Sequence, residues 1–114
     1  MIKNYIKRSI EPVLKKAATE FPAVILTGPR QAGKTTVLQQ HFGESFRYVS
    51  LEPPDIRASA NEDPRSFLKT NPPPVIFDEI QYAPDLLSYI KENIDANRNK
   101  NGQYLLTGSQ NLLL

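Results

Sequence analysis

One eight-residue segment has the residue types and the spacing of a phosphate-binding loop. Residues Gly28 to Thr35, GPRQAGKT, match the pattern G-x-x-x-x-G-K-[ST]. In a chain of this composition the pattern has roughly two chances in a thousand of arising at random. Backbone N–H groups can converge on phosphate oxygens only where side chains stay out, which explains a glycine at each end. The segment predicts a polyphosphate site; the alternative is a Gly/Pro turn with a solvated lysine.

Individual positions of this loop have expected roles at the phosphates. We expect the Lys34 ammonium to reach the β- and γ-phosphates and the Thr35 hydroxyl to complete the shell of a Mg²⁺ ion. Thr36 can contact the α-phosphate, because the helix after the loop presents free amides and its positive dipole end. Arg30 has two open interpretations: it contacts phosphate, or it faces solvent or a carboxylate. The predicted nucleotide-binding residues are Gly28, Pro29, Arg30, Gln31, Ala32, Gly33, Lys34, Thr35 and Thr36.

An acidic pair follows an apolar segment later in the chain. Asp78 and Glu79 come directly after Val75-Ile76-Phe77. Ligands of parallel sheets bind at the carboxyl ends of the strands, so we expect Asp78 to lie beside the loop and to hold the Mg²⁺ hydration shell. Glu79 can accept a proton from an attacking water, which makes it the candidate catalytic base. The alternative is an ordinary strand-to-helix turn with solvated acids.

A second polar strand end lies near the carboxyl terminus, at Thr107-Gly108-Ser109-Gln110. If this strand lies between the strand before the loop and the acidic strand, Ser109 or Gln110 can hydrogen-bond the γ-phosphate or the attacking water. A capping or turn role for both is the alternative. Ser50, after another predicted strand, either holds Glu79 away from the water or is a surface serine.

The elements that must position these residues alternate along the chain. Apolar periodicity, prolines and glycines indicate helices at 9–20, 34–42 and 84–97 and short helical pieces within 52–71, one starting at Asp63-Pro64. Continuous or alternating apolar runs indicate strands at 23–27, 46–51, 72–79 and 103–109, with the first buried on both faces and a turn at 99–102. Strands separated by helices predict an α/β fold with a parallel sheet.

Composition and charge exclude several classes of protein. The 114 residues contain no cysteine and one histidine, His41, so thiolate zinc sites and His-rich metal sites are excluded. No apolar run approaches the roughly 20 residues of a membrane span, and we expect a cytoplasmic protein without a membrane partner. Residues 1–50 carry eight Lys/Arg against three Glu, a balance of +5, and residues 51–114 carry six against nine acids, a balance of −3. The first half therefore favours an anionic ligand.

Three segments together resemble a known family. GPRQAGKTT, VIFDEIQ and YLLTGSQNLLL, in this order and spacing, are similar to the P-loop ATPases of the AAA+ superfamily. They most resemble the AAA domain 14 group, the N-terminal part of proteins with a C-terminal DUF4143 region, from about Tyr5 to Leu114. The resemblance implies a three-layer α/β/α P-loop NTPase fold with strand order 5-1-4-3-2 and ATP and Mg²⁺ as ligands. It further implies Glu79 as catalytic base and Ser109 or Gln110 as sensor 1; Gln81 belongs to the group's DEIQ pattern without an assigned role.

The resemblance also implies parts that have no counterpart in these 114 residues. We expect a partial domain over residues 1–114, with four of the usual five core strands and without the arginine finger, second sensor, lid and C-terminal region. Such a fragment, split product or decayed copy is expected to bind nucleotide with low turnover. The open edge of strand 23–27 allows self-association or a C-terminal partner region, and residues 112–114 are expected to begin a helix.

Other functions fit the sequence less well. A P-loop kinase needs an arginine-bearing lid, and none is visible. A GTPase needs N-K-x-D after a strand, whereas Asn97 to Asn101 lacks the Asp and precedes its strand. A binding module without catalysis, for nucleotide or nucleic acid, remains the alternative function. Nucleic acid would be contacted by the basic residues of the N-terminal segment, which otherwise form a solvated helix face: Lys3, Lys7, Arg8, Lys15 and Lys16.

Overall fold

The structure is a computed structural model that describes residues 11–27 and 44–108. Helices and strands alternate over these residues, as the sequence predicts. The helices are α2 (Glu11–Glu20), α4 (Pro54–Glu62), α5 (Pro64–Thr70), α6 (Leu86–Ala96) and the 3₁₀ helix η2 (Ile80–Tyr82); the strands are β1 (Ala23–Thr27), β2 (Arg47–Ser50), β3 (Val75–Asp78) and β4 (Tyr104–Gly108). The predicted helices at 34–42 and from residue 112 lie outside the described residues.

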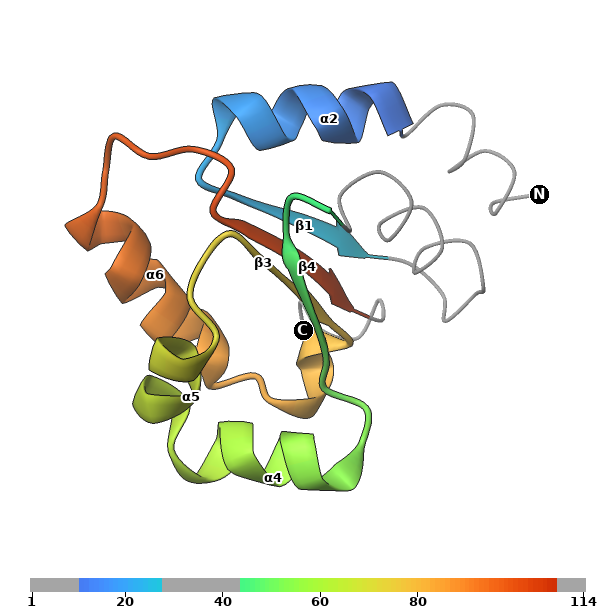
Figure 1. The fold of residues 1–114 in the computed structure, drawn as a ribbon, viewed down its shortest axis with the longest axis vertical. Coiled ribbons are helices and arrows are strands. Elements are labelled where there is room, and N and C mark those ends of the chain that lie inside the picture. The colour runs from blue at the N-terminus through green and yellow to red at the C-terminus, as the bar shows by residue number, and fades with distance from the viewer. Residues whose placement is uncertain (1–10, 28–43, 109–114) are drawn as a thin grey trace.

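The four described strands form one parallel sheet in the order β1-β4-β3-β2. The order confirms the predicted α/β fold, and it equals the order 5-1-4-3-2 without its first member. β4, the last strand in the chain, therefore lies between β1 and β3 (Figure 1). All four strands point the same way, so their carboxyl ends meet at one edge of the sheet.

Helices cover both faces of the sheet. Successive side chains of a strand point to opposite faces, so each strand contributes apolar residues to a core on either side. Val75 and Phe77 belong to a large core cluster with residues of α4, α5 and α6, whereas Ile76 packs with Leu105 and with Ala18 of α2 in a smaller one. Figure 1 shows α2 on one side of the sheet and the other three helices on the opposite side. The arrangement is the three-layer architecture of P-loop NTPases.

Two prolines and an aspartate define the helices between β2 and β3. Pro54 and Pro64 occupy the first positions of α4 and α5, where the missing N–H costs no helical hydrogen bond. The Asp63 carboxylate accepts a hydrogen bond from the Ser66 backbone N–H at 3.1 Å and so caps α5. The predicted helix start at Asp63-Pro64 is confirmed.

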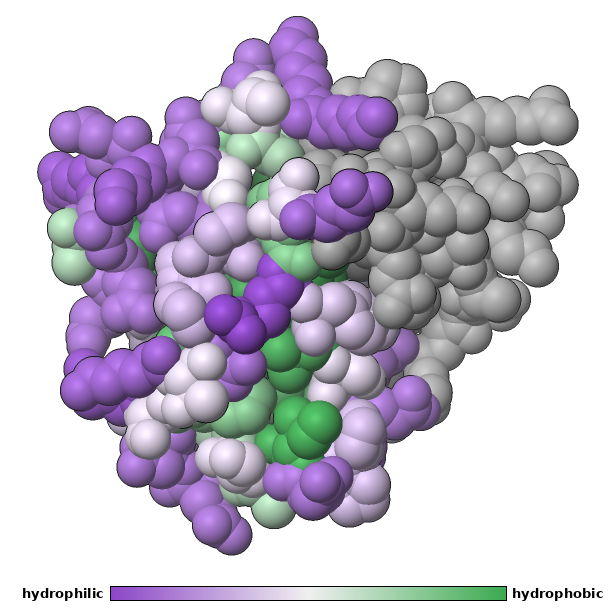
Figure 2. Space-filling view, viewed as in Figure 1, coloured by the Kyte–Doolittle hydropathy of each residue, from purple (hydrophilic) through white to green (hydrophobic). Residues whose placement is uncertain are grey.

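An ion pair on the surface joins α5 to α6. Arg65 donates to Glu92 at 2.7 Å, and both side chains are more than half exposed, so water screens the pair and it adds little stability. The hydrogen bond from Arg65 to Glu92 raises the pKa of the guanidinium above its ordinary value. Charged and polar residues cover much of the face drawn in Figure 2, where the deepest green, most hydrophobic surface lies in the lower middle.

Two expectations about element boundaries and burial need correction. The helix expected from Pro84 begins at Leu86, since a turn at 83–85 and η2 come first. Strand β1, expected to be buried on both faces, is only half-buried, and Ile25 is 44% exposed. In the described sheet β1 lies at one edge, so it has a described neighbouring strand on one side only. The prediction that β1 is buried on both faces was based on its continuous apolar run and is wrong.

The predicted turn at 99–102 fixes where β4 starts. Gly102 has φ +66°, and a Cβ at this position would lie 2.8 Å from the Ala18 carbonyl oxygen of α2. Its N–H donates to the Phe21 carbonyl at 2.9 Å. Glycine is needed here for both the backbone conformation and the close approach. The turn thereby sets β4 beside β1 and brings their carboxyl ends level.

Candidate nucleotide site

The acidic pair, the polar end of β4 and the end of the strand that precedes the loop sequence lie at the carboxyl edge of the sheet. The register pairs Thr27 with Gly108 across β1 and β4, and Phe77 with Leu106 across β3 and β4. Asp78 therefore lies level with Thr107, one strand away from the end of β1. Gly28, the first glycine of the loop sequence, follows Thr27 directly in the chain. The strands thus bring the acidic pair and the start of the loop to the same edge.

The Asp78 carboxylate is buried and receives two hydroxyl donors. The Thr107 hydroxyl donates to one carboxylate oxygen and the Tyr48 phenol of β2 donates to the other. Asp78 is 3% exposed and Thr107 is fully buried. Hydrogen bonds to both oxygens stabilise a buried carboxylate and fix its plane. Asp78 is therefore held rigidly at the sheet edge, and the alternative of a solvated acid is wrong.

Glu79 has an unusual backbone conformation and two hydrogen-bond partners. Its φ and ψ are 63° and 53°, in the left-handed region that residues with a Cβ seldom adopt. The Glu79 N–H donates to the Thr107 hydroxyl oxygen at 2.9 Å, and its Oε1 accepts from Gln81 Nε2 at 2.7 Å. Strained residues of this kind persist only where the surroundings hold them, and they cluster at functional sites.

Thr107, Tyr48 and Gln81 are the contacts that the sequence analysis missed. Thr107 was recognised only as part of a polar strand end, although it bonds both acids. A usable signal existed: a hydroxyl at the end of an otherwise apolar, buried strand needs a polar partner. Tyr48 carried no comparable signal, because a tyrosine in a strand commonly packs its ring. Gln81 stood in the DEIQ pattern, but the pattern did not identify its partner.

The remaining predictions at this edge have different outcomes. The Ser50 hydroxyl accepts a hydrogen bond from the Glu52 N–H at 3.2 Å, as a turn-forming serine does. The predicted order, with β4 between β1 and β3, is confirmed. The other predicted site residues lie outside the described residues and stay predictions: residues 28–36, including Lys34, Thr35 and Thr36, and residues Ser109 and Gln110.

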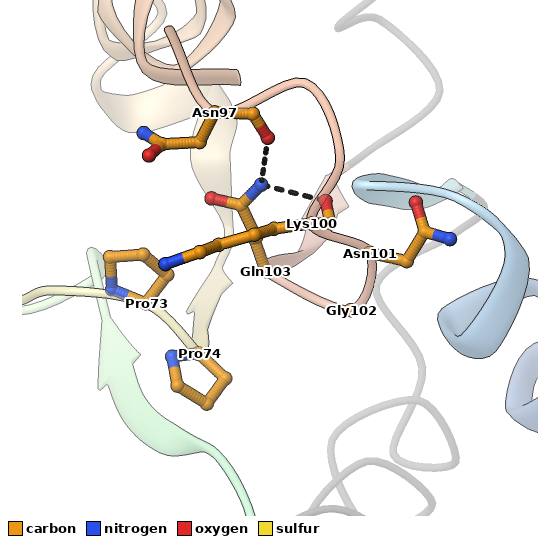
Figure 3. A pocket seen from close by; sticks show the side chains of 7 residues that line it. All are labelled: Pro73, Pro74, Asn97, Lys100, Asn101, Gly102 and Gln103. Carbon is orange, nitrogen blue, oxygen red and sulfur yellow. Dashed lines mark hydrogen bonds between the residues drawn. The ribbon is translucent and has the colours of Figure 1, made fainter.

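A cavity of about 460 Å³ lies at the opposite, amino-terminal end of β3 and β4. It is lined by Pro73, Pro74, Asn97, Lys100, Asn101, Gly102 and Gln103. Figure 3 shows the Gln103 amide bonded to two main-chain carbonyls, those of Lys100 at 2.8 Å and Asn97 at 3.4 Å, while the Lys100 side chain extends toward Pro73. These bonds close the turn after α6. The cavity touches neither acid and is separate from the candidate site.

Neither a metal-binding cluster of acids and histidines nor a membrane-spanning helix is found in the described part of the chain. Over residues 11–27 and 44–108, no three His, Cys, Asp or Glu side chains gather to hold a metal by themselves. Within the same residues, no helix has both the length and the apolar character that crossing a membrane requires. Of the basic residues considered for nucleic acid, Lys15 and Lys16 are exposed on α2, and the other three lie outside the described residues.

Comparisons with known proteins identify the family of the chain. A family model described as "AAA domain" (AAA_14) matches residues 20–114. Two curated relatives are each 33% identical over 90 residues: "Uncharacterized protein Mb2031c" of Mycobacterium bovis and "Uncharacterized protein Rv2008c" of Mycobacterium tuberculosis. Each match covers 78% of this chain and 20% of the relative, so the chain spans about one fifth of the relatives' length. No solved structure matches. The chain belongs to the AAA_14 family of AAA domains, a family of nucleotide-binding, ATPase-like modules.

Proposed function

We propose that this chain binds Mg²⁺-ATP at the carboxyl edge of the sheet and hydrolyses it. The observation that carries the proposal is the pair Asp78 and Glu79, buried and hydrogen-bonded at the sheet edge where the strand that precedes the loop sequence also ends. Burying two adjacent carboxylates is unfavourable, so such a pair is expected where cationic groups offset the charge. The loop sequence provides a lysine, and the proposed ligand provides a divalent cation.

The residues present fit a magnesium nucleotide. Mg²⁺ prefers hard oxygen ligands and is commonly held through one or two carboxylates together with phosphates and waters. Asp78 supplies a carboxylate with its orientation fixed by two hydroxyls, and Thr35 would supply a hydroxyl. Bound Mg²⁺ would offset the negative charge of the phosphates. Under this proposal Asp78 is the one carboxylate that holds the ion, and phosphates, waters and Thr35 supply its other ligands. No group of three or more potential metal ligands is needed, and the described residues contain none.

The chain's own groups divide the proposed reaction between them. The backbone N–H groups of residues 28–33, Pro29 excepted, and the Lys34 ammonium would bind and orient the phosphates. Glu79 would accept the proton of the attacking water at a carboxylate oxygen. Ser109 or Gln110, which follow β4, would orient that water or the γ-phosphate.

Thermal unfolding with and without ligand tests the proposal. A ligand at one hundred times its Kd adds about 2.7 kcal/mol to the free energy of unfolding. For 114 residues, an unfolding entropy of about 2.1 cal/mol/K per residue converts this to a rise in Tm of about 11 °C. We expect the rise with Mg²⁺-ATP, and none in Lys34→Ala. Lys91→Ala, which removes an exposed lysine of α6, is the matched control and should keep the rise.

Glu79→Gln separates binding from hydrolysis. The amide keeps the shape of the side chain but cannot accept the proton, so the variant should keep the Mg²⁺-ATP shift and lose phosphate release. Equal phosphate release in variant and wild type would remove Glu79 from the mechanism. An unchanged Tm of the wild type at millimolar Mg²⁺-ATP would reject nucleotide binding itself.

A further inference from the structure

The side chain of Gln81 contacts the candidate base directly. Gln81 lies in η2, two residues after Glu79, and its Nε2 donates to Glu79 Oε1 at 2.7 Å. Glu79 is 8% exposed, so this bond forms largely out of water. A hydrogen bond from a neutral donor to a buried carboxylate is stronger than one at the surface. The contact therefore restrains the orientation of the Glu79 carboxylate.

The turn that carries Gln81 is anchored in the core and on α4. Ile80 and Ala83 are fully buried, and the Ala83 N–H donates to the Ile80 carbonyl at 2.9 Å. From α4, Asn61 Nδ2 donates to the Tyr82 carbonyl at 2.9 Å, and the Arg57 guanidinium carbon lies 3.9 Å from the centre of the Tyr82 ring. Residues on both sides of Gln81 are thus fixed, so its amide has a defined position relative to Glu79.

The backbone of Glu79 is fixed from the other side. Its N–H is bonded to the Thr107 hydroxyl of β4, and its left-handed conformation turns the chain sharply between β3 and η2. With the backbone held, rotation about the side-chain bonds of Glu79 determines where its carboxylate points. The Gln81 amide restricts that rotation by holding one carboxylate oxygen.

We propose that Gln81 is a positioning residue that holds the Glu79 carboxylate in the orientation needed for proton transfer. This inference rests on the proposed ATP hydrolysis. A general base must lie within hydrogen-bond reach of the water it deprotonates, and a small displacement lowers the rate steeply. In this scheme Gln81 acts through its hydrogen bond to Glu79. Its loss should therefore lower kcat and leave nucleotide affinity unchanged.

The test compares Gln81→Ala and Gln81→Glu with wild type and with Asn99→Ala. Asn99 is an exposed amide in the turn after α6, so its variant controls for loss of an amide alone. In Gln81→Ala we expect kcat for phosphate release to fall at least about tenfold, as for loss of a hydrogen bond to a charged group. The Kd of Mg²⁺-ATP should change by less than about twofold, since only transition-state positioning is removed. Gln81→Glu should lose more, because two carboxylates then repel each other. Asn99→Ala should match wild type.

Several outcomes would overturn the inference. An unchanged or increased kcat in Gln81→Ala would show that the contact does not assist the base. A rise in the Kd of Mg²⁺-ATP with kcat unchanged would place Gln81 in nucleotide binding instead. A purely structural role would lower Tm in proportion to the loss of activity, and it would not rank the glutamate variant below the alanine variant at equal stability.

A second measurement does not depend on activity. Unfolding constants of Gln81→Ala, Glu79→Ala and the double variant form a cycle with wild type, and we expect a coupling of at least about threefold between the two positions. If the effects of the two single variants on the unfolding constant simply add in the double variant, the inferred interaction between Gln81 and Glu79 is overturned. If wild type releases no phosphate, the proposed hydrolysis fails, while the cycle still decides between a coupled and an uncoupled pair. The two failures are therefore distinguishable.

Discussion

Removal of the Thr107 hydroxyl should disturb both acids at once. Thr107 is fully buried; its hydroxyl donates to Asp78 and accepts the Glu79 N–H at 2.9 Å. In Thr107→Val the shape of the side chain is kept, but Asp78 loses a donor and the Glu79 N–H loses its acceptor. A hydrogen bond to a charged group contributes about 1.5–3 kcal/mol, and an unsatisfied buried donor costs about 1–3 kcal/mol more.

We therefore expect Thr107→Val to lower the free energy of unfolding by about 3 kcal/mol. With an unfolding entropy of about 2.1 cal/mol/K for each of the 114 residues, Tm should fall by about 12 °C. Urea unfolding followed by circular dichroism measures the free energy, and thermal unfolding measures Tm. The loss is a large share of the 5–15 kcal/mol typical of a domain, so it is readily measured.

Two further variants make the test specific to the hydroxyl. Thr107→Ser keeps both hydrogen bonds and loses one buried methyl group, which costs about 1 kcal/mol. Thr19→Val removes an exposed hydroxyl that bonds only the Lys16 carbonyl, at 2.7 Å, and should change stability by less than about 0.5 kcal/mol. The reasoning is refuted if the valine at 107 is as stable as wild type, or more stable than the serine.

Two other predictions concern the elements that position the site. Gly102→Ala should lower the free energy of unfolding by more than about 1 kcal/mol, because alanine is strained at φ +66° and its Cβ would lie 2.8 Å from a backbone oxygen; stability equal to wild type in urea would contradict the close approach of α2. Asp63→Ala should cost about 1 kcal/mol by removing the cap of α5. Asp63→Asn keeps a capping oxygen and should retain most of that stability; an equal loss in both variants would argue against the cap.

The elements were predictable because their signals are local. Apolar runs with β-branched residues identify β1 and β3, and Asp63-Pro64 identifies the start of α5, since a cap and a fixed φ act within one turn. Strand order was predictable only through the family resemblance. Nothing in the residues of β4 by itself states that this last strand inserts between β1 and β3.

The contacts that Tyr48 and Thr107 make with the acids were not predictable as pairs, because both residues come from distant parts of the chain. Tyr48 is 30 residues from Asp78, and Thr107 is 28 residues from Glu79. Such pairs exist only after the sheet has formed in its register, and an isolated tyrosine or threonine has many possible partners. Gln81 is the opposite case: it is close in sequence, but its contact depends on the left-handed turn at Glu79, which a non-glycine residue rarely signals.

The contacts of the acids also determine how nucleotide binding would proceed. The bonds described at Asp78 and Glu79 come from β2, β4 and η2, elements built from residues 47–108. The described bonds to both carboxylates therefore come from donors anchored in the core. Groups preorganised in this way need little rearrangement when charge develops near them, which is the condition for effective electrostatic catalysis. Under the proposed function, variants of Lys34 should change nucleotide affinity first, and variants of Gln81 should act on the chemistry that follows binding. Variants of Thr107 should change both affinity and turnover, because Thr107 bonds both acids.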